Sequence, residues 1–256
     1  MGSGFTSRLQ KGGAALDDTR RVVELWDADL GPRQNFKHFS SENLLSKASR
    51  SRVDDLLRRI IRPRYVDPGP HVIPALKGLL ADHAAFRNAC YYESARADDL
   101  LASFAEGPLW DYWLEGRLGL GIEDVLVWFD HLAERGQAPV WTDNVRAKTA
   151  RGLLSALRDF GILQGSAKSR RKEIPPPSMS PRGFAYVAWR EHEQGASSRT
   201  LATSRVWRRW LLEDSLVDDM FLQVARLGVL RVSRAGSAVR VDWLVDSLAE
   251  VTGAAA

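Results

Sequence analysis

The chain has little cysteine: Cys90 is the only one in 256 residues. A single thiol excludes an internal disulfide and a zinc site built from several cysteines, and it fits a reducing cytoplasm. We expect Cys90 to be buried filler rather than a nucleophile. Long apolar runs are also missing, because the longest, at 125–129, is far shorter than the roughly 20 residues that span a bilayer. The first residues, MGSGFTSRLQKGG, lack the apolar core of a signal peptide, so no membrane partner is expected.

Signs of an enzyme are sparse as well. No two histidines have the i, i+3 or i+4 spacing of a helical metal site; they are His38, His71, His83, His131 and His192. The GLGIED stretch at 119–124 lacks the third glycine and the Lys-Ser/Thr of a phosphate loop, and it predicts a helix N-terminus instead. Pairs of aspartates recur, but each lies in or near a helix beside basic residues. We therefore predict no catalysis, no metal and no cofactor.

What the chain does have is clustered positive charge and many tryptophans. The 36 Lys and Arg residues barely exceed the 32 Asp and Glu residues, so the net charge is only +4. The nine tryptophans can anchor several small cores. Because total charge bears on association and not on fold, the positions of the basic residues carry more information than their number.

The first 66 residues predict three short helices with tight turns, in a helix-turn-helix-like arrangement. Helices are expected at 16–25 and 33–39, since Gly31-Pro32 interrupts the chain between them. A third helix carries an apolar stripe at i, i+3, i+4, i+7 and i+8, and Pro63 is expected to end it. The stripe residues are Val53, Leu56, Leu57, Ile60 and Ile61.

After a Pro/Gly linker and a helical stretch, one pattern occurs twice. An amphipathic helix from 122 to Gly136 is followed by a helix from 141 capped by Thr142 or Asp143, and then by the polar run QGSAKSRRKE. The C-terminal part repeats two helices and a hairpin, 230–243, in which apolar and charged residues alternate. We predict a mainly α protein with helix-turn-helix or winged-helix units and short β-hairpin wings. The expected segments are 1–66, 67–120, 121–195 and 196–256.

The helix after Ser40 holds the first basic cluster. Asp54 precedes Arg58 by four positions. Asp55 precedes Arg59 by the same spacing, and acid-first pairs of this kind stabilise a helix by about 0.2–0.5 kcal/mol. Arginines in the first turn have no such local reason, since the helix dipole disfavours cations there. The candidate contacts with an anionic partner are Lys47, Ser49, Arg50, Ser51 and Arg52.

Further candidates lie on the later helices and hairpins. One face of the helix after Thr142 is polar without a carboxylate until Asp159, as a helix in the DNA major groove requires. A basic run follows on the predicted hairpin, suited to the phosphate backbone. The TSRVWRRW stretch offers arginines beside tryptophans, although such tryptophans are more often core. The candidates are Asn144, Lys148, Arg151, Ser155, Lys168, Arg170, Arg171, Lys172, Arg205, Arg208 and Arg234.

Several stretches together resemble the BrxA family of bacterial BREX phage-defence systems. They are FTSRLQKGGAALDDTRRVVELW, FKHFSSENLLSKASRSRVDDLLRRIIRPRY, ADDLLASF and WTDNVRAKTARGLLSALRDFGIL. The resemblance covers 5–163, and the last ninety or so residues extend past it. It implies a cytoplasmic, mostly helical, non-enzymatic protein that binds double-stranded DNA within a multi-protein system.

Three hypotheses follow for the function. The first is a DNA-binding accessory protein that contacts phosphates through helix N-termini and basic hairpins. The second is an assembly adaptor whose basic faces dock acidic partner proteins, and other proteins of the defence system are candidates for that partner. The third is a winged-helix transcription regulator. The sequence leaves open the DNA site, competition by RNA and the oligomeric state.

Overall fold

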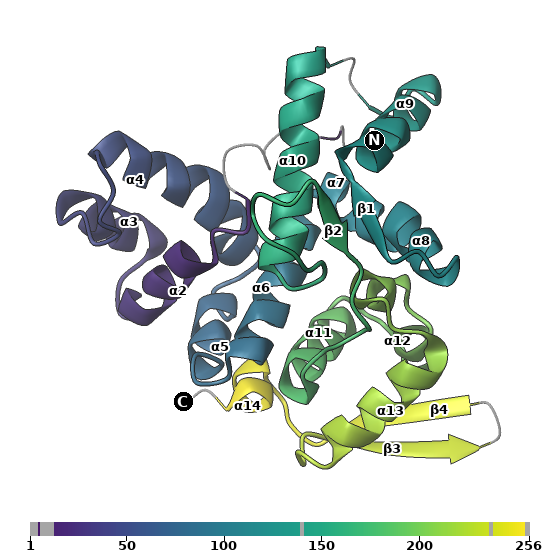
Figure 1. Cartoon of the computed structure of the whole chain (residues 1–256). Helices are drawn as coiled ribbons and strands as arrows, with labels where there is room; N and C mark the ends of the chain where they lie inside the picture. Colours follow the sequence, from purple (N-terminus) through teal and green to yellow (C-terminus); the bar gives the residue numbers. More distant parts are fainter. Residues whose placement is uncertain (1–4, 6–12, 139–140, 236–237, 254–256) are drawn as a thin grey trace. The chain divides into compact units, whose positions relative to one another are not determined.

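A computed structural model describes residues 5, 13–138, 141–235 and 238–253. The side chains of residues 234, 235 and 238 lie outside this description. The chain is mainly helical, as predicted, and carries two small antiparallel sheets (Figure 1). It forms two compact units: unit 1 holds residues 1–14, 94–178 and 205–213, and unit 2 holds residues 15–93, 179–204 and 214–256. These bounds differ from the four predicted segments, whose independence as domains stays a prediction.

Unit 2 begins with three short helices close to the predicted positions. They are α2 (Leu16–Leu25), α3 (Pro32–Ser41) and α4 (Arg50–Leu56). Buried Asn35 orders the turn before α3, since its side chain accepts from the Asp27 N–H at 3.0 Å and donates to the Leu30 carbonyl at 3.0 Å. Helices α3 and α4 lie side by side (Figure 1). The predicted apolar stripe is buried at Val53, Leu57, Ile60 and Ile61.

The helix does not end at Pro63, and this prediction was wrong. It continues as η1 (Leu57–Val66), a π-helical stretch that contains Pro63. The N–H of Asp67 bonds the carbonyl of Arg62 at 2.9 Å, five residues back. Proline lacks an N–H and its ring strikes the carbonyl of the preceding turn in an α-helix, whereas the wider π turn moves that carbonyl away. As a result, α4 and η1 form one continuous helix that ends at Val66.

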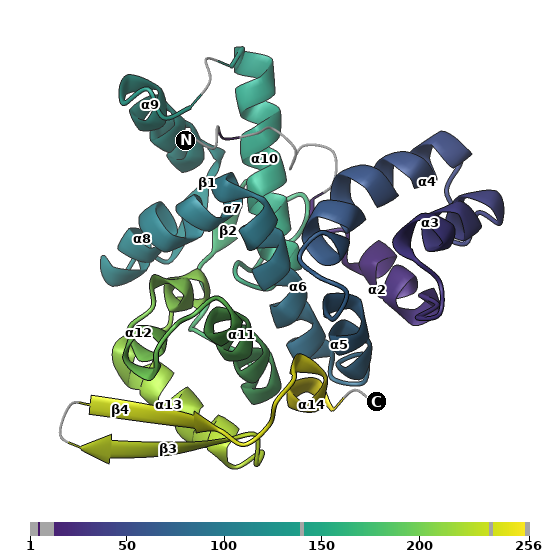
Figure 2. The same cartoon turned by 180° about the vertical axis from the view of Figure 1, so that it is seen from behind.

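The rest of unit 2 consists of helices and one hairpin. The elements are α5 (Val72–Gly78), α6 (His83–Ala97), α11 (Pro181–Glu193), α12 (Ser198–Ala202), α13 (Asp214–Ala225), β3 (Leu230–Ala235), β4 (Ala238–Trp243) and α14 (Leu248–Thr252). The division between the units falls within α6, after Glu93. The predicted C-terminal hairpin is confirmed, with Val232 opposite Val241, and β3 packs beside α13 (Figure 2). Its tip, residues 236–237, lies outside the described residues. Cys90 is buried in α6 as predicted, and burial raises the pKa of its thiol.

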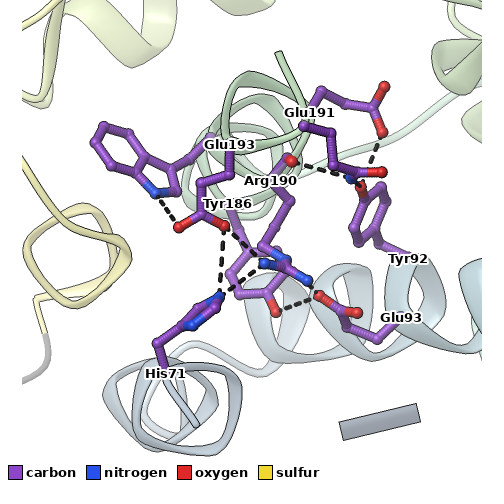
Figure 3. A network of polar contacts seen from close by, with 9 residues as sticks. His71, Tyr92, Glu93, Tyr186, Arg190, Glu191 and Glu193 are labelled. Atoms are coloured by element: carbon purple, nitrogen blue, oxygen red, sulfur yellow. Dashed lines mark hydrogen bonds and ion pairs between the residues drawn. The ribbon is translucent and has the colours of Figure 1, made fainter. Parts of the chain in front are cut away.

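A network of polar side chains joins α6 to α11 (Figure 3). Buried Arg190 donates through Nε to Glu93 at 2.8 Å and through a terminal nitrogen to Glu193 at 2.6 Å. The same terminal nitrogen of Arg190 lies 2.8 Å from Nε2 of His71. The hydroxyl of Tyr186 also donates to Glu93, at 2.8 Å. Since buried charges are tolerated when they are paired and hydrogen-bonded, these contacts are a structural link between the two helices.

Unit 1 is built from more helices than the sequence predicts. Its elements are α7 (Asp99–Phe104), η2 (Ala105–Leu109), α8 (Trp110–Leu114), β1 (Gly119–Gly121), α9 (Ile122–Glu134), α10 (Asp143–Asp159), β2 (Arg171–Glu173) and η3 (Arg205–Trp210). Within the helical stretch that the sequence predicts before residue 121, Asp98 starts a new helix by accepting from the backbone N–H of Leu100 and Leu101. Pro108 then falls inside η2. No helix of the described chain is long and apolar enough to cross a bilayer.

The basic hairpin of unit 1 has an additional strand beside it. One isolated bridge joins Gln164 to Glu173 where the hairpin was predicted, and β2 pairs antiparallel with β1, with Leu120 opposite Lys172. Gly119 is required there, because a Cβ at this position would lie 2.7 Å from the Lys172 carbonyl oxygen. Gly121 precedes α9, so the GLGIED stretch does form a helix N-terminus.

Candidate nucleic-acid interface

Helix α10 presents its predicted polar face to solvent. Thr142 is its N-cap residue, in line with the sequence, although its side chain makes no capping bond. The apolar face is buried at Leu153 and Leu157, which fixes the rotation of the helix. On the opposite face the predicted residues Asn144, Lys148 and Arg151 are exposed and Ser155 is half-buried. The helix therefore offers these side chains to a partner from a rigid support.

The basic loop that follows α10 is held by its own backbone and by one lysine. Gln164 and Glu173 exchange backbone hydrogen bonds of 2.9 and 3.0 Å. The ammonium of Lys172 donates to the carbonyls of Ser166 at 2.6 Å and Ser169 at 2.8 Å. Lost hydration, followed by the positive charge of Arg158, lowers the pKa of Lys172. Lys172 thus shapes the loop, while Lys168 and Arg170 are exposed on it.

Helix α10 and this loop together enclose a basic cavity of about 550 Å³. Its cationic lining comes from two elements: Arg151 and Arg158 of α10, and Lys168, Arg170 and Lys172 of the loop. Ser155 contributes a hydroxyl, and Glu123 is the carboxylate in the lining. We call this set the α10–loop surface. It joins five of the predicted site residues with Arg158, which lies on the same helix but was not among the predicted contacts.

Arg171 belongs to a neighbouring ion-pair cluster. Its guanidinium donates to the Gly119 carbonyl at 2.9 Å and lies 4.0 Å from Asp124. Asp124 accepts from Arg117 at 2.6 Å and from the Gly121 N–H at 2.7 Å. Partial burial alone would raise the pKa of Asp124, but the bonds from Arg117 and Gly121 and the charges of both arginines lower it. This cluster fastens the start of α9 to the loop.

The N-terminal candidates are partly occupied by local contacts. Lys47 forms an ion pair with Asp18 at 2.6 Å. The hydroxyl of Ser49 caps α4 by accepting from the backbone N–H of Arg52. Arg50 donates to the Ser41 carbonyl at 3.3 Å.

The other residues of this N-terminal cluster form local ion pairs or are exposed. The predicted local pairs exist, with Arg58 4.0 Å from Asp54 and Arg59 3.1 Å from Asp55. Ser51 and Arg52 are exposed. Their contact with an anionic partner stays a prediction.

The last three candidates lie apart from the α10–loop surface along the chain. Arg208 lies with its guanidinium carbon 5.3 Å from the centre of the Trp110 ring. Trp207 and Trp210 are buried, as tryptophans of a core are. Arg205 is exposed in η3. Arg234 lies in β3, and its side chain is outside the described residues.

A second basic cavity, in unit 2, was missed by the sequence analysis. It is a groove of about 1130 Å³ between α3 and the helix formed by α4 and η1. Besides Arg50 and Arg58, its cations are Arg33, Lys37 and Arg62. The i, i+4 spacing of Arg33 and Lys37 in the sequence indicates that both lie on one face of a helix. The contribution of Val66 and Asp67 was hidden, because the helix was expected to end at Pro63, before either residue.

The described part of the chain offers no cluster of metal ligands. No three His, Cys, Asp or Glu side chains gather there in a way that could hold an ion. The titratable groups that do gather, around Arg190, are bound to one another in the network of Figure 3. The basic cavities are therefore the surfaces on which a function is argued.

Comparison with known proteins gives one family. The BrxA family model matches residues 3–191. The match runs further than the resemblance at 5–163, ends within α11 and leaves residues 192–256 outside it. No curated protein matches the chain. Since the matched residues make up well over half of the sequence, the chain belongs to the BrxA family.

Proposed function

We propose that this protein is a non-enzymatic accessory protein of a BREX phage-defence system that binds double-stranded DNA. Membership of the BrxA family associates the chain with BREX systems. The observation that supports DNA binding best is the α10–loop surface, where cations from a helix and from a loop line one cavity. A cytoplasmic location, expected from the single cysteine, is part of the same proposal.

The order of elements in unit 1 supports this use of the surface. Strand β1, helices α9 and α10, the basic loop and strand β2 follow one another as the elements of a winged helix do. In that arrangement the second helix enters the major groove, and α10 would take this place. Asn and Arg side chains reach base edges there, whereas Lys168 and Arg170 on the loop suit phosphate oxygens.

The length of the polar face fits a duplex. From Asn144 to Arg158 the face extends about 21 Å at 1.5 Å per residue. Lys148 and Arg151 lie between these ends and are exposed. Because most of these side chains are cationic or neutral donors, we expect phosphate contacts to dominate and sequence preference to be modest.

Duplex binding measured across a salt series tests the proposal. A labelled duplex of random sequence should bind, and log K should fall with log salt by about 0.9 for each phosphate neutralised. The same titration with single strands and with RNA measures the preference for duplex. Absence of duplex binding at low salt contradicts the proposal. A specific site bound about 10³-fold tighter than random duplex would favour a transcription regulator instead.

A further inference from the structure

The groove in unit 2 has two regular helical walls. One wall is α3, and the other is the continuous helix of α4 and η1. We call it the α3–α4 groove. Along the second wall the lining residues repeat every four positions, so one stripe of the helix faces the groove. They are Arg50, Asp54, Arg58, Arg62 and Val66. At the rise of an α-helix this stripe extends on the order of 20 Å, or about four turns.

The rim of the α3–α4 groove has an excess of positive charge. Its five cations face two carboxylates, Asp54 and Asp67. Each carboxylate already has a cationic neighbour, since Asp54 lies 4.0 Å from Arg58 and Asp67 lies 3.1 Å from Arg62. Arg33 and Lys37, both exposed on α3, have no ion pair among the described residues. The unpaired cations are thus concentrated on the α3 wall.

The uncharged lining between these cations is apolar at Pro32, Phe36 and Val66 and polar at Ser40 and Ser41. Phe36 is half-buried between Arg33 and Lys37 on α3, and its ring packs edge-to-face on Trp26 with 6.1 Å between centroids. Half-buried Val66 closes the end of the opposite wall. A sugar-phosphate backbone would satisfy the cations and the serine hydroxyls but would leave Phe36 and Val66 uncovered. An amphipathic helix with carboxylates beside an apolar stripe covers both, as peptides do in helix-binding grooves.

The groove is preformed in the free chain. Asn35 ties the start of α3 to the preceding turn through bonds of 3.0 Å to the Asp27 N–H and 2.9 Å to the Asp27 carbonyl. Phe39 of α3 and Val53 of α4 are fully buried beneath the walls. Walls that are ordered before binding reduce the entropy lost on association.

We propose that the α3–α4 groove docks an acidic amphipathic helix of a partner protein. The rim cations Arg33, Lys37 and Arg50 would pair with its carboxylates, and Phe36 and Val66 would receive its apolar stripe. This inference does not depend on DNA binding by unit 1. It assigns Arg50 to protein recognition, whereas Arg52, which does not line the groove, keeps its predicted contact with DNA.

A labelled model peptide tests the docking proposal. The probe is a stapled helix of about 18 residues with Leu and Phe on one stripe and Glu elsewhere, followed by fluorescence anisotropy against the full chain. The R33E/K37E variant should weaken its binding at least about tenfold. Both substituted residues are exposed, so the thermal melt should match that of the wild type. A second peptide with the apolar stripe changed to Ser should bind at least about tenfold more weakly.

The matched control reverses two exposed arginines of unit 2 outside the groove, as R87E/R226E. It should change peptide binding by less than about threefold. Duplex binding is titrated with the same variants. If R33E/K37E lowers duplex affinity well beyond R87E/R226E, the groove is a DNA surface and the proposal fails. It also fails if no saturable peptide binding occurs. Loss of DNA binding by the wild type, in contrast, bears only on the function proposed above.

Discussion

The Nε of Arg190 donates to the Oε1 of Glu93 at 2.8 Å, and both side chains are buried. Glu93 lies on α6 and Arg190 on α11, nearly a hundred residues apart in the chain. The same carboxylate oxygen accepts from the Tyr186 hydroxyl, and burial followed by the charge of Glu93 raises the pKa of that hydroxyl. The pair therefore joins two distant segments of unit 2 at a place where water cannot replace either partner.

Glu93→Ala should destabilise the protein strongly. Removing one partner of a buried ion pair leaves the other charge uncompensated and costs about 3–5 kcal/mol. The free energy of unfolding measured by urea denaturation checks this value. The control is Asp55→Ala, which removes the exposed partner of Arg59 and should cost less than about 1 kcal/mol. Equal losses for the two variants would contradict the structural role of Glu93.

Asp124 should make the stability of the chain depend on acid pH. Its folded-state pKa lies below the ordinary value of 3.8, because burial, which would raise it, is outweighed by the bonds from Arg117 and Gly121. Above the ordinary value the carboxylate stabilises the fold, and this contribution is lost as the pH falls through the lower folded value. When thermal melting is measured from neutral pH to strong acid, the melting temperature of Asp124→Asn should fall less at low pH than that of the wild type. Parallel curves would contradict the assignment.

The sequence predicted local structure better than the surfaces that the structure assembles. The apolar stripe from Val53 to Ile61 and the acid-first pairs were visible because helix contacts join residues three and four apart. The continuation of the helix through Pro63 was not, since a π turn depends on the packing around it rather than on the residue itself. The strand that pairs with the basic loop was also unforeseen, because β1 lies about fifty residues earlier in the chain.

In the candidate sites, too, the sequence predicted single elements but not how the fold combines them. The α10 face and the loop were predicted as separate elements, and the structure brings Arg151 and Lys168 to one cavity. The α3–α4 groove was missed because its walls come from separate helices, and a charge on one helix predicts nothing about its neighbour across a groove. Lys47 was predicted as a contact with an anionic partner, but it pairs with Asp18 of α2, which lies far from it in the chain. Pairing over such distances in sequence follows from the fold alone.

Lys172→Met should weaken duplex binding by loosening the loop. The ammonium is occupied by the Ser166 and Ser169 carbonyls, so its loss removes loop order rather than a phosphate contact. We expect affinity to fall about three- to tenfold with an unchanged salt slope. Arg170→Ala, which removes an exposed cation, should instead reduce the slope by about 0.9. A slope change for Lys172→Met equal to that of Arg170→Ala would show that Lys172 contacts a phosphate.

Arg50 and Arg52 should separate in their effects, although both lie in the first turn of α4. Arg52→Ala should reduce the salt slope of duplex binding by about 0.9 and leave the model peptide unaffected. Arg50→Ala should weaken the peptide, because Arg50 lines the α3–α4 groove. Neither change should unfold the chain, since both residues are exposed. If instead Arg58→Ala and Arg59→Ala lower the affinity for duplex DNA, these two arginines contact DNA and do more than form local ion pairs.

Reversing charge on both elements of the α10–loop surface should abolish most duplex binding. The R151E/K168E variant removes one cation from α10 and one from the loop, and puts two carboxylates into the cavity that they line. Loss of the phosphate contact of Lys168 reduces the salt slope by about 0.9, and with the loss of Arg151 from the major groove we expect an affinity loss of about 100-fold at moderate salt. The R87E/R226E control changes the net charge equally, so it measures the general effect of charge on association. If the R87E/R226E control loses as much affinity for duplex as R151E/K168E, the overall charge of the protein attracts DNA. The α10–loop surface is then not the DNA-binding site.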